Sequence, residues 1–223
     1  DFADPKNLLK LGDVIQQGVN TLNSLSEPPK AFSEMGDFIT NKSAETFSNI
    51  AFNSYKKFKD SSPIISIENP PAGGALSRGE DLKKLVEEAR NKFVDKAVDE
   101  LGMSKGEAER QAKKLIGVTW DVGHINMLRK FGYSDKEILK ETEKIAKMAK
   151  HIHLSDNFGY EHTELPMGMG NVPTKEHLEA LQKYNKKMKQ IVETGNWFGP
   201  QGFGNNTPFL ETLRAFGSPV YAM

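Results

Sequence analysis

The sequence predicts an α/β fold: a parallel (β/α) barrel of the TIM type, with its C-terminal half present and extra helices before it. Three observations predict this fold. After residue 60, short β-branched runs alternate with helical stretches, which is typical of βα units. The runs are apolar except near their ends, as in strands buried on both faces. Two runs end 32 positions apart, at Asp121 and His153, close to the roughly 31 residues per unit of an eight-unit barrel.

Composition and charge exclude several classes of protein. The chain has 223 residues, 30 basic and 30 acidic side chains, five His and no Cys. Without Cys there is no disulfide, thiolate metal site or thiol catalysis. A net charge of zero gives no long-range attraction to nucleic acid or to an anionic membrane. No run approaches the roughly 20 apolar residues of a membrane span, and no signal peptide opens the chain, so we expect a cytoplasmic protein without membrane contact.

Residues 1–60 are predicted to form an N-terminal helical segment. Apolar residues recur at helical spacing over 5–24, including Leu8, Ile15 and Leu22. A second helix is predicted over 43–59. Its apolar side is expected to carry Phe47, Ile50, Ala51 and Phe58. No strand is expected before residue 60.

Residues 61–223 are predicted to form the βα units. The expected strands are 63–68, 116–121, 151–154 and 218–221. Between them, three serines followed three positions later by Glu have the spacing of a capping box and predict helix starts: Ser77, Ser104 and Ser134. A helical hairpin is expected near 95–115, and a further helix over 174–189.

This part amounts to about three and a half βα units, or half a barrel. A half barrel leaves open strand edges and an uncovered core. The chain also begins at Asp1 rather than Met and stops at Met223. We therefore expect that the N-terminal half of the barrel is missing from this chain, or that a second chain supplies it.

Polar side chains stand where the predicted strands end. Glu68 closes the first strand, Asp121 the second, and His153 lies in the third. Side chains alternate along a strand, so each can face the barrel interior at the C-terminal rim, where catalytic residues of barrels gather. Each residue alone has an ordinary explanation as a turn, cap or core residue. Together, two carboxylates and an imidazole predict a site for manganese, zinc, cobalt or magnesium.

Two other histidines have structural interpretations. His151 shares the face of His153 and is interpreted as structural. His177 lies on a polar face of the helix predicted over 174–189 and is expected to be solvated.

Four segments resemble the last strands of the xylose isomerase-like barrel superfamily, over about residues 60–175. The superfamily includes sugar isomerases and epimerases, and endonuclease IV of AP endonuclease family 2. The segments are Ile67–Gly74, Trp120–His124, His151–Asn157 and Leu165–Gly170. They indicate the superfamily but do not distinguish its members.

The resemblance implies a role for each of these residues. Glu68, Asp121 and His153 would bind the metal, and Glu68 would also act as the catalytic base. His124 would bind substrate in an epimerase and metal in the endonuclease, and Asp156 is expected to bind substrate or to support a ligand.

Two positions depart from the family pattern. Where the family often has Asp-x-His, this chain has His162-Thr163-Glu164, so His162 and Glu164 are further candidate ligands. The Glu that ends the last strand of the epimerases has no counterpart after the strand expected at 218–221.

The predicted function is that of a divalent-metal-dependent isomerase or epimerase acting on a sugar or sugar phosphate through a metal-stabilised enediolate. One alternative is a zinc-dependent apurinic-site endonuclease of the endonuclease IV type, in which the partner is nucleic acid. A second alternative is a non-catalytic barrel relative, or a subunit that binds a partner chain.

Overall fold

The structure, a computed structural model, describes residues 5–24 and 35–195, and the chain divides into two compact units, 1–35 and 36–223. In the first unit, helix α1 (Pro5–Ser24) confirms the helix predicted over 5–24. Its apolar side chains are exposed, among them Leu8, Ile15 and Leu22. Among the described residues, no helix combines the length and apolarity needed to cross a membrane.

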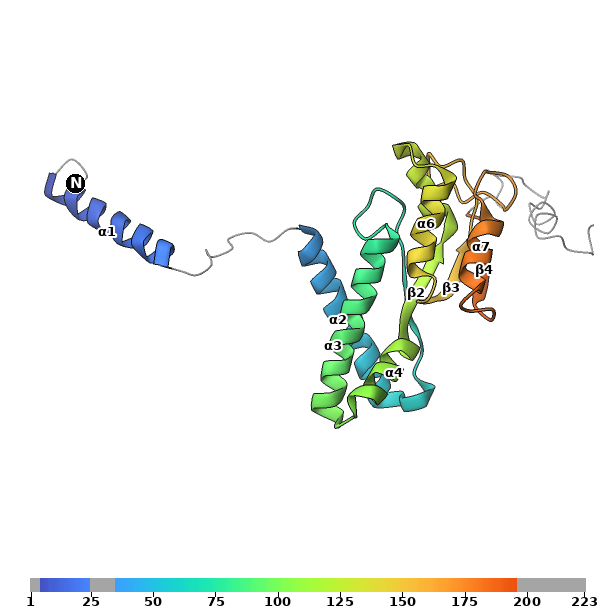
Figure 1. Cartoon of the computed structure of the whole chain (residues 1–223), viewed down its shortest axis with the longest axis horizontal. Coiled ribbons are helices and arrows are strands. Elements are labelled where there is room, and N and C mark those ends of the chain that lie inside the picture. Colours follow the sequence, from blue (N-terminus) through green and yellow to red (C-terminus); the bar gives the residue numbers. More distant parts are fainter. Residues whose placement is uncertain (1–4, 25–34, 196–223) are drawn as a thin grey trace, which may run out of the picture. The chain divides into compact units, whose positions relative to one another are not determined.

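The second unit contains a four-stranded parallel sheet in the order β1-β2-β3-β4 (Figure 1). Its strands are β1 (Ile65–Glu68), β2 (Ile116–Asp121), β3 (Ala149–Leu154) and β4 (Lys189–Val192). The first three confirm predicted strands. The strand predicted at 218–221 lies outside the described residues.

Helix α2 (Met35–Phe58) and the 3₁₀ turn η1 (Lys59–Ser61) precede β1. The strands are connected by α3 (Gly79–Leu101), α4 (Lys105–Leu115), α5 (Val122–Asn126), the 3₁₀ turn η2 (Met127–Phe131), α6 (Asp135–Ile145) and α7 (Thr174–Gln182). The α3–α4 pair confirms the predicted hairpin. Helix α7 begins where predicted but ends at Gln182, because the chain then turns and enters β4.

The core lies on the outer face of the sheet. On the face opposite to Asp121 and His153, the side chains of the two central strands are buried: Val118, Trp120, Ile152 and Leu154. Helix α3 packs on β2 and on α6. Phe93 of α3 meets the rings of Phe52 and Tyr55 of α2 edge to face, with ring centroids 6.2 and 6.1 Å apart. This layer holds the sheet from one side and leaves its inner face to the polar side chains.

Helix α2 differs from its prediction in length and in buried face. It begins at Met35 rather than 43, and Ile50 and Phe58, expected on the apolar side, are 46% and 48% exposed. The buried stripe consists of four small residues and two aromatic residues: Thr40, Ala44, Ser48, Ala51, Phe52 and Tyr55. Ala51 is buried and Phe47 is partly buried, as predicted, but small residues carry little apolar signal, so the pattern also included the exposed Ile50 and Phe58.

Two of the three predicted helix starts are confirmed. Ser104 accepts from the backbone of Glu107, and Glu137 accepts from both the N–H and the hydroxyl of Ser134. The start at Ser77 is wrong. Helix α3 begins at Gly79, whose N–H donates to Glu141 Oε2 at 2.8 Å.

The described residues establish an α/β fold with a parallel sheet. Within them, β1 and β4 each pair with a neighbour on one side only, and every residue of β4 is exposed. Closure of the sheet into a barrel therefore stays a prediction.

Candidate metal centre

The ends of the four strands bring four potential metal ligands together. Glu68 ends β1, Asp121 ends β2, His153 lies near the end of β3, and Glu193 follows β4 directly. One ligand atom from each residue lies within 4.8 Å of the others. Because the strands are parallel and adjacent in order, their carboxyl ends meet at one edge, which is what the sequence predicted for the first three residues.

Glu193 is the site residue that sequence reasoning missed. We expected the last strand at 218–221 and so found no Glu at its end. The structure places a strand at Lys189–Val192 with Glu193 directly after it. The sequence signal for this strand end covers only three residues. Ile191-Val192-Glu193 places Glu directly after a β-branched residue, as Ile67-Glu68 does at the end of the first strand.

His153 lies between the two glutamates. Its Nδ1 is 3.0 Å from Glu68 Oε1 and 2.9 Å from Glu193 Oε2. A single Nδ1 proton can hydrogen-bond well to only one of them at a time. Two carboxylates directed at one nitrogen atom create a negative electrostatic potential there, which favours the binding of a cation.

The two carboxylate oxygens of Asp121 differ in their hydrogen bonding. The residue is fully buried. Its Oδ1 accepts from the His124 backbone N–H at 2.9 Å and from the Ser155 hydroxyl at 3.2 Å. Its Oδ2 is buried and has no hydrogen-bond partner in the described part of the chain. A buried unpaired carboxylate oxygen is costly, and a divalent cation held with Glu68, His153 and Glu193 would satisfy it.

The electrostatics of Glu193 agree with this fit. Burial raises the pKa of its carboxyl; His153 opposes that shift, and the charges of Asp121, Glu68 and Glu164 add to it. The carboxylates thus repel one another, and the positive charge of a bound divalent cation would offset that repulsion.

A second group of donors adjoins the first. His124 Nε2 lies 2.7 Å from His162 Nε2 and 3.8 Å from Asp121 Oδ2. His162 Nε2 is also 3.1 Å from Glu164 Oε1. The structure therefore brings the further candidate ligands His162 and Glu164 next to the Glu68–Asp121–His153–Glu193 group.

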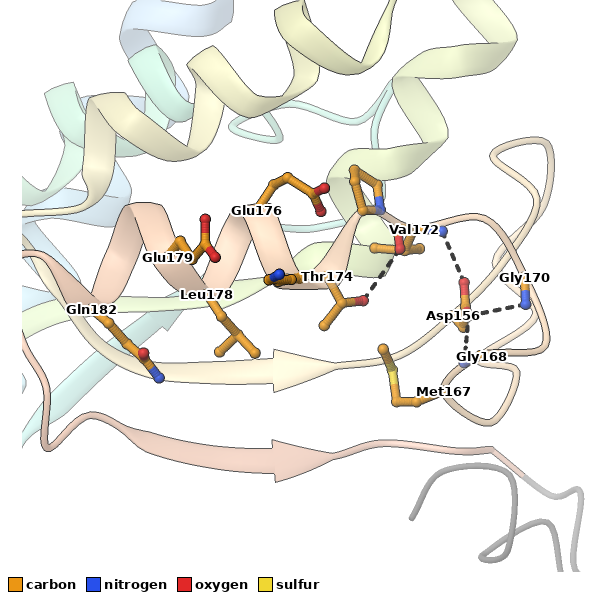
Figure 2. A pocket seen from close by; sticks show the side chains of 12 residues that line it. Asp156, Met167, Gly168, Gly170, Val172, Thr174, Glu176, Leu178, Glu179 and Gln182 are labelled. Carbon is orange, nitrogen blue, oxygen red and sulfur yellow. Dashed lines mark hydrogen bonds between the residues drawn. The ribbon is translucent and has the colours of Figure 1, made fainter. Parts of the chain in front are cut away.

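Asp156 does not point into that group. It is buried, and its carboxylate accepts from the backbone N–H groups of Gly168, Gly170 and Val172 at 2.9, 2.9 and 3.0 Å (Figure 2). A Cβ at Gly170 would lie 2.3 Å from Asp156 Oδ1, so the loop closes around the carboxylate. Asp156 also lines a cavity of about 550 Å³ beside α7. Its contacts support the loop, and substrate binding by Asp156 stays a prediction.

The remaining histidines have different environments. The ring of His151 packs edge to face on the ligand candidate His153, with centroids 5.0 Å apart, and burial lowers its pKa. His177 was expected to be solvated, and that expectation is wrong. It is fully buried, its Nδ1 lies 2.7 Å from Thr142 Oγ1, and burial lowers its pKa to about 4.

Comparisons with known proteins give partial similarities. No family model matches the chain. An uncharacterized protein of Methanocaldococcus jannaschii, MJ1311, is 33% identical over 70 residues, or 31% of this chain and 22% of that protein. The chain thus matches less than a quarter of the length of this relative. A crystal structure of a D-tagatose 3-epimerase-like protein aligns with 86% of this chain and 78% of its own, at 18% identity and a TM-score of 0.39. A similarity at that TM-score is too weak to assign a fold.

Proposed function

We propose that the chain carries the metal centre of a divalent-metal-dependent isomerase or epimerase that acts on a sugar or sugar phosphate. The observation that carries the proposal is the arrangement of Glu68 and Glu193. Their carboxylate oxygens both lie close to the ligand candidate His153, within 3.0 and 2.9 Å of its Nδ1. Two carboxylates at one site suit a reaction in which one group removes a proton from carbon and another returns it.

The residues divide the work as follows. Glu68, Asp121, His153 and Glu193 would hold the cation. When bound, a manganese, zinc, cobalt or magnesium ion supplies a Lewis acid that stabilises negative charge on substrate oxygens.

Proton transfer belongs to the two glutamates. Glu68 accepts the proton from the substrate carbon, and Glu193, whose carboxylate lies as close to His153 Nδ1 as that of Glu68, is the group that carries a proton back. His124 binds a substrate hydroxyl next to the cation. Asp156 supports the loop that borders the site.

We further propose that residues 61–223 form half of a closed (β/α) barrel after a helical segment of residues 1–60. The parallel order β1-β2-β3-β4 supports this, as do the outer edges of β1 and β4, which pair with no other strand among residues 35–195. Additional βα units, from a longer form of the chain or from a second chain, would complete the barrel.

Metal binding and hydrogen exchange test the function. Purified protein should bind one or more equivalents of Mn²⁺, Zn²⁺ or Co²⁺ by elemental analysis. Glu68→Ala and His153→Ala should lose the ion, whereas the exposed-site variant Glu161→Ala should keep it. With metal present in D₂O, NMR should show a substrate C–H becoming C–D in ketoses or their phosphates. Wild-type protein without bound metal would favour a non-catalytic relative and end this proposal.

The second candidate is an apurinic-site endonuclease, and the His124–His162–Glu164 group is the observation that favours it. These donors lie beside Asp121, so two cations could share one carboxylate, as in metal-assisted phosphodiester hydrolysis. Cleavage of a duplex with a single abasic site, with salt-sensitive binding and loss of cleavage in His162→Ala, would establish the nuclease. Hydrogen exchange in a sugar without DNA cleavage would exclude it.

A further inference from the structure

The hydrogen-bond ladder between β1 and β2 continues past the end of β1 through a side chain. Glu68 is the last residue of β1 in the pairing, and two prolines follow Asn69, which turn the chain away because proline cannot donate to a ladder. The side chain of Asn69 takes the place of the missing strand. Its Nδ2 donates to Asp121 O at 3.1 Å, and its Oδ1 accepts from Asp121 N–H at 2.7 Å. A carboxamide matches a peptide group, so it adds one rung at Asp121.

The backbone of the same residue determines the tautomer of an imidazole. Asn69 O lies 2.7 Å from His124 Nδ1, and a carbonyl oxygen can only accept, so Nδ1 carries the proton. In the neutral ring, Nε2 then has the lone pair, and Nε2 faces His162 Nε2 and the unpaired Oδ2 of Asp121. Ala72 N–H donates to His124 O at 3.1 Å and holds the same turn.

The turn after β2 is also held from the side of β3. Ser155 Oγ donates to Asp121 Oδ1 at 3.2 Å, and Asn157 Nδ2 donates to Gly123 O at 2.8 Å. A Cβ at Gly123 would lie 2.1 Å from Ser155 Oγ, so the close approach requires glycine. With Oδ1 of Asp121 engaged, Oδ2 is the oxygen available to a cation.

We propose that Asn69 is a positioning residue that aligns Asp121 Oδ2 and His124 Nε2 toward one point of the metal centre. Asn69 is fully buried and acts through these two residues, by its side-chain amide and its carbonyl. The inference rests on the proposed function in that Asp121 and His124 serve the cation or its substrate. An aspartate at position 69 has the same shape but lacks the donor and sets a carboxylate against Asp121 O.

Manganese affinity tests the inference. Isothermal titration with Mn²⁺ should give a Kd that is about 10- to 100-fold higher in Asn69→Asp and Asn69→Ala than in the wild type, the usual cost of removing a support of a metal ligand. Variants that are folded by circular dichroism and bind Mn²⁺ like the wild type would overturn it.

A matched control separates positioning from general loosening. Asn126 is equally buried, and its side chain bonds Asn157, Asn171 and Arg129 rather than a ligand candidate. Asn126→Ala should lower the melting temperature but keep the Mn²⁺ Kd within about threefold of wild type. An equal loss of affinity in Asn126→Ala and Asn69→Ala would contradict the inference.

A metal-free readout keeps the two proposals apart. Nitrogen-15 NMR of the wild type should show His124 protonated at Nδ1 and unprotonated at Nε2, and Asn69→Ala should mix the two tautomers. An Nε2–H tautomer in the wild type would overturn the role of Asn69 even if Mn²⁺ binds. Failure of the wild type to bind Mn²⁺, with the Nδ1–H tautomer observed, would instead refute the proposed function and leave the Asn69 geometry established.

Discussion

Strand β2 separates two regions that use imidazoles in opposite ways. On its inner side, His153 lies between Glu68 and Glu193 at the edge of the sheet. On its outer side, His177 is buried behind Trp120. There, the Thr142 hydroxyl accepts from Trp120 Nε1 at 2.9 Å and lies 2.7 Å from His177 Nδ1.

The difference lies in what each histidine has around it. The inner site collects carboxylates that repel one another and leaves an oxygen of Asp121 without a hydrogen-bond partner in the described part of the chain, so a bound cation would stabilise it. At the outer site, no charged side chain of the described residues pairs with His177, and burial keeps that ring neutral. We therefore expect substitutions at the inner site to change metal binding, and substitutions on the outer side to change the free energy of unfolding.

The largest expected effect is on the outer side, in Phe93→Ala. Phe93 is fully buried and packs against two aromatic rings, so the cavity should lower the free energy of unfolding by about 3–5 kcal/mol. Urea unfolding measures this loss. The folded protein should bind Mn²⁺ as the wild type does, and a parallel loss of Mn²⁺ affinity would break the comparison.

The pH dependence of stability tests His177. Its pKa is about 4 in the folded protein and about 6.5 when unfolded, so between these values the unfolded chain binds more protons. The free energy of unfolding should be highest above pH 6.5 and should fall by roughly 3 kcal/mol as the pH approaches 4. The difference between wild type and His177→Leu in urea titrations isolates this contribution. If the free energy of unfolding changed equally with pH in both proteins from pH 6.5 to 4, His177 would not be held neutral in the folded protein.

Glu193→Gln tests the inner side. It should weaken Mn²⁺ binding by at least about 100-fold, or roughly 2.7 kcal/mol, because it removes a charged ligand. The free energy of unfolding without metal should stay the same or rise, since one source of repulsion is gone. Calorimetric titration and urea unfolding check the two parts. Glu161→Gln changes an exposed carboxyl outside the Glu68–Asp121–His153–Glu193 group and should alter neither quantity.

The smallest expected effect is that of Thr142→Val. It leaves Trp120 Nε1 and His177 Nδ1 without their hydroxyl partner in a buried place, at a cost of about 1–2 kcal/mol in unfolding free energy. Thr46→Val, at an exposed position of α2, should change stability by less than about 0.5 kcal/mol. Equal effects of the two substitutions would mean that the buried contact contributes nothing.

The strands that were predicted correctly are those with a strong local pattern. Ile116-Gly117-Val118-Thr119-Trp120-Asp121 combines β-branched residues with a polar end, and β2 has these bounds. Strand β4 begins with Lys189 and Gln190 and is exposed along its length, so it lacked that pattern. The prediction ended the preceding helix at residue 189 and expected no further strand before 218, so Glu193 was missed with β4.

The same reasoning explains the histidines. Glu68, Asp121 and His153 could be predicted because strand ends at one edge of a parallel sheet must lie close together. The burial of His177 could not, because the polar residues around it in α7 resemble a solvated face. Its burial depends on Thr142 of α6, which is distant in sequence.

By itself, the sequence determined the alternation of strands and helices, and it determined the three donors at or near the ends of β1, β2 and β3. Both depend on periodicity and polarity over a few consecutive residues, which a single sequence shows directly. Only the tertiary structure decided that Glu193 joins them, that Asn69 completes the ladder at Asp121, and that His177 is buried. These contacts link residues far apart in the chain, and their energies depend on distance and solvent exposure, which no local pattern records.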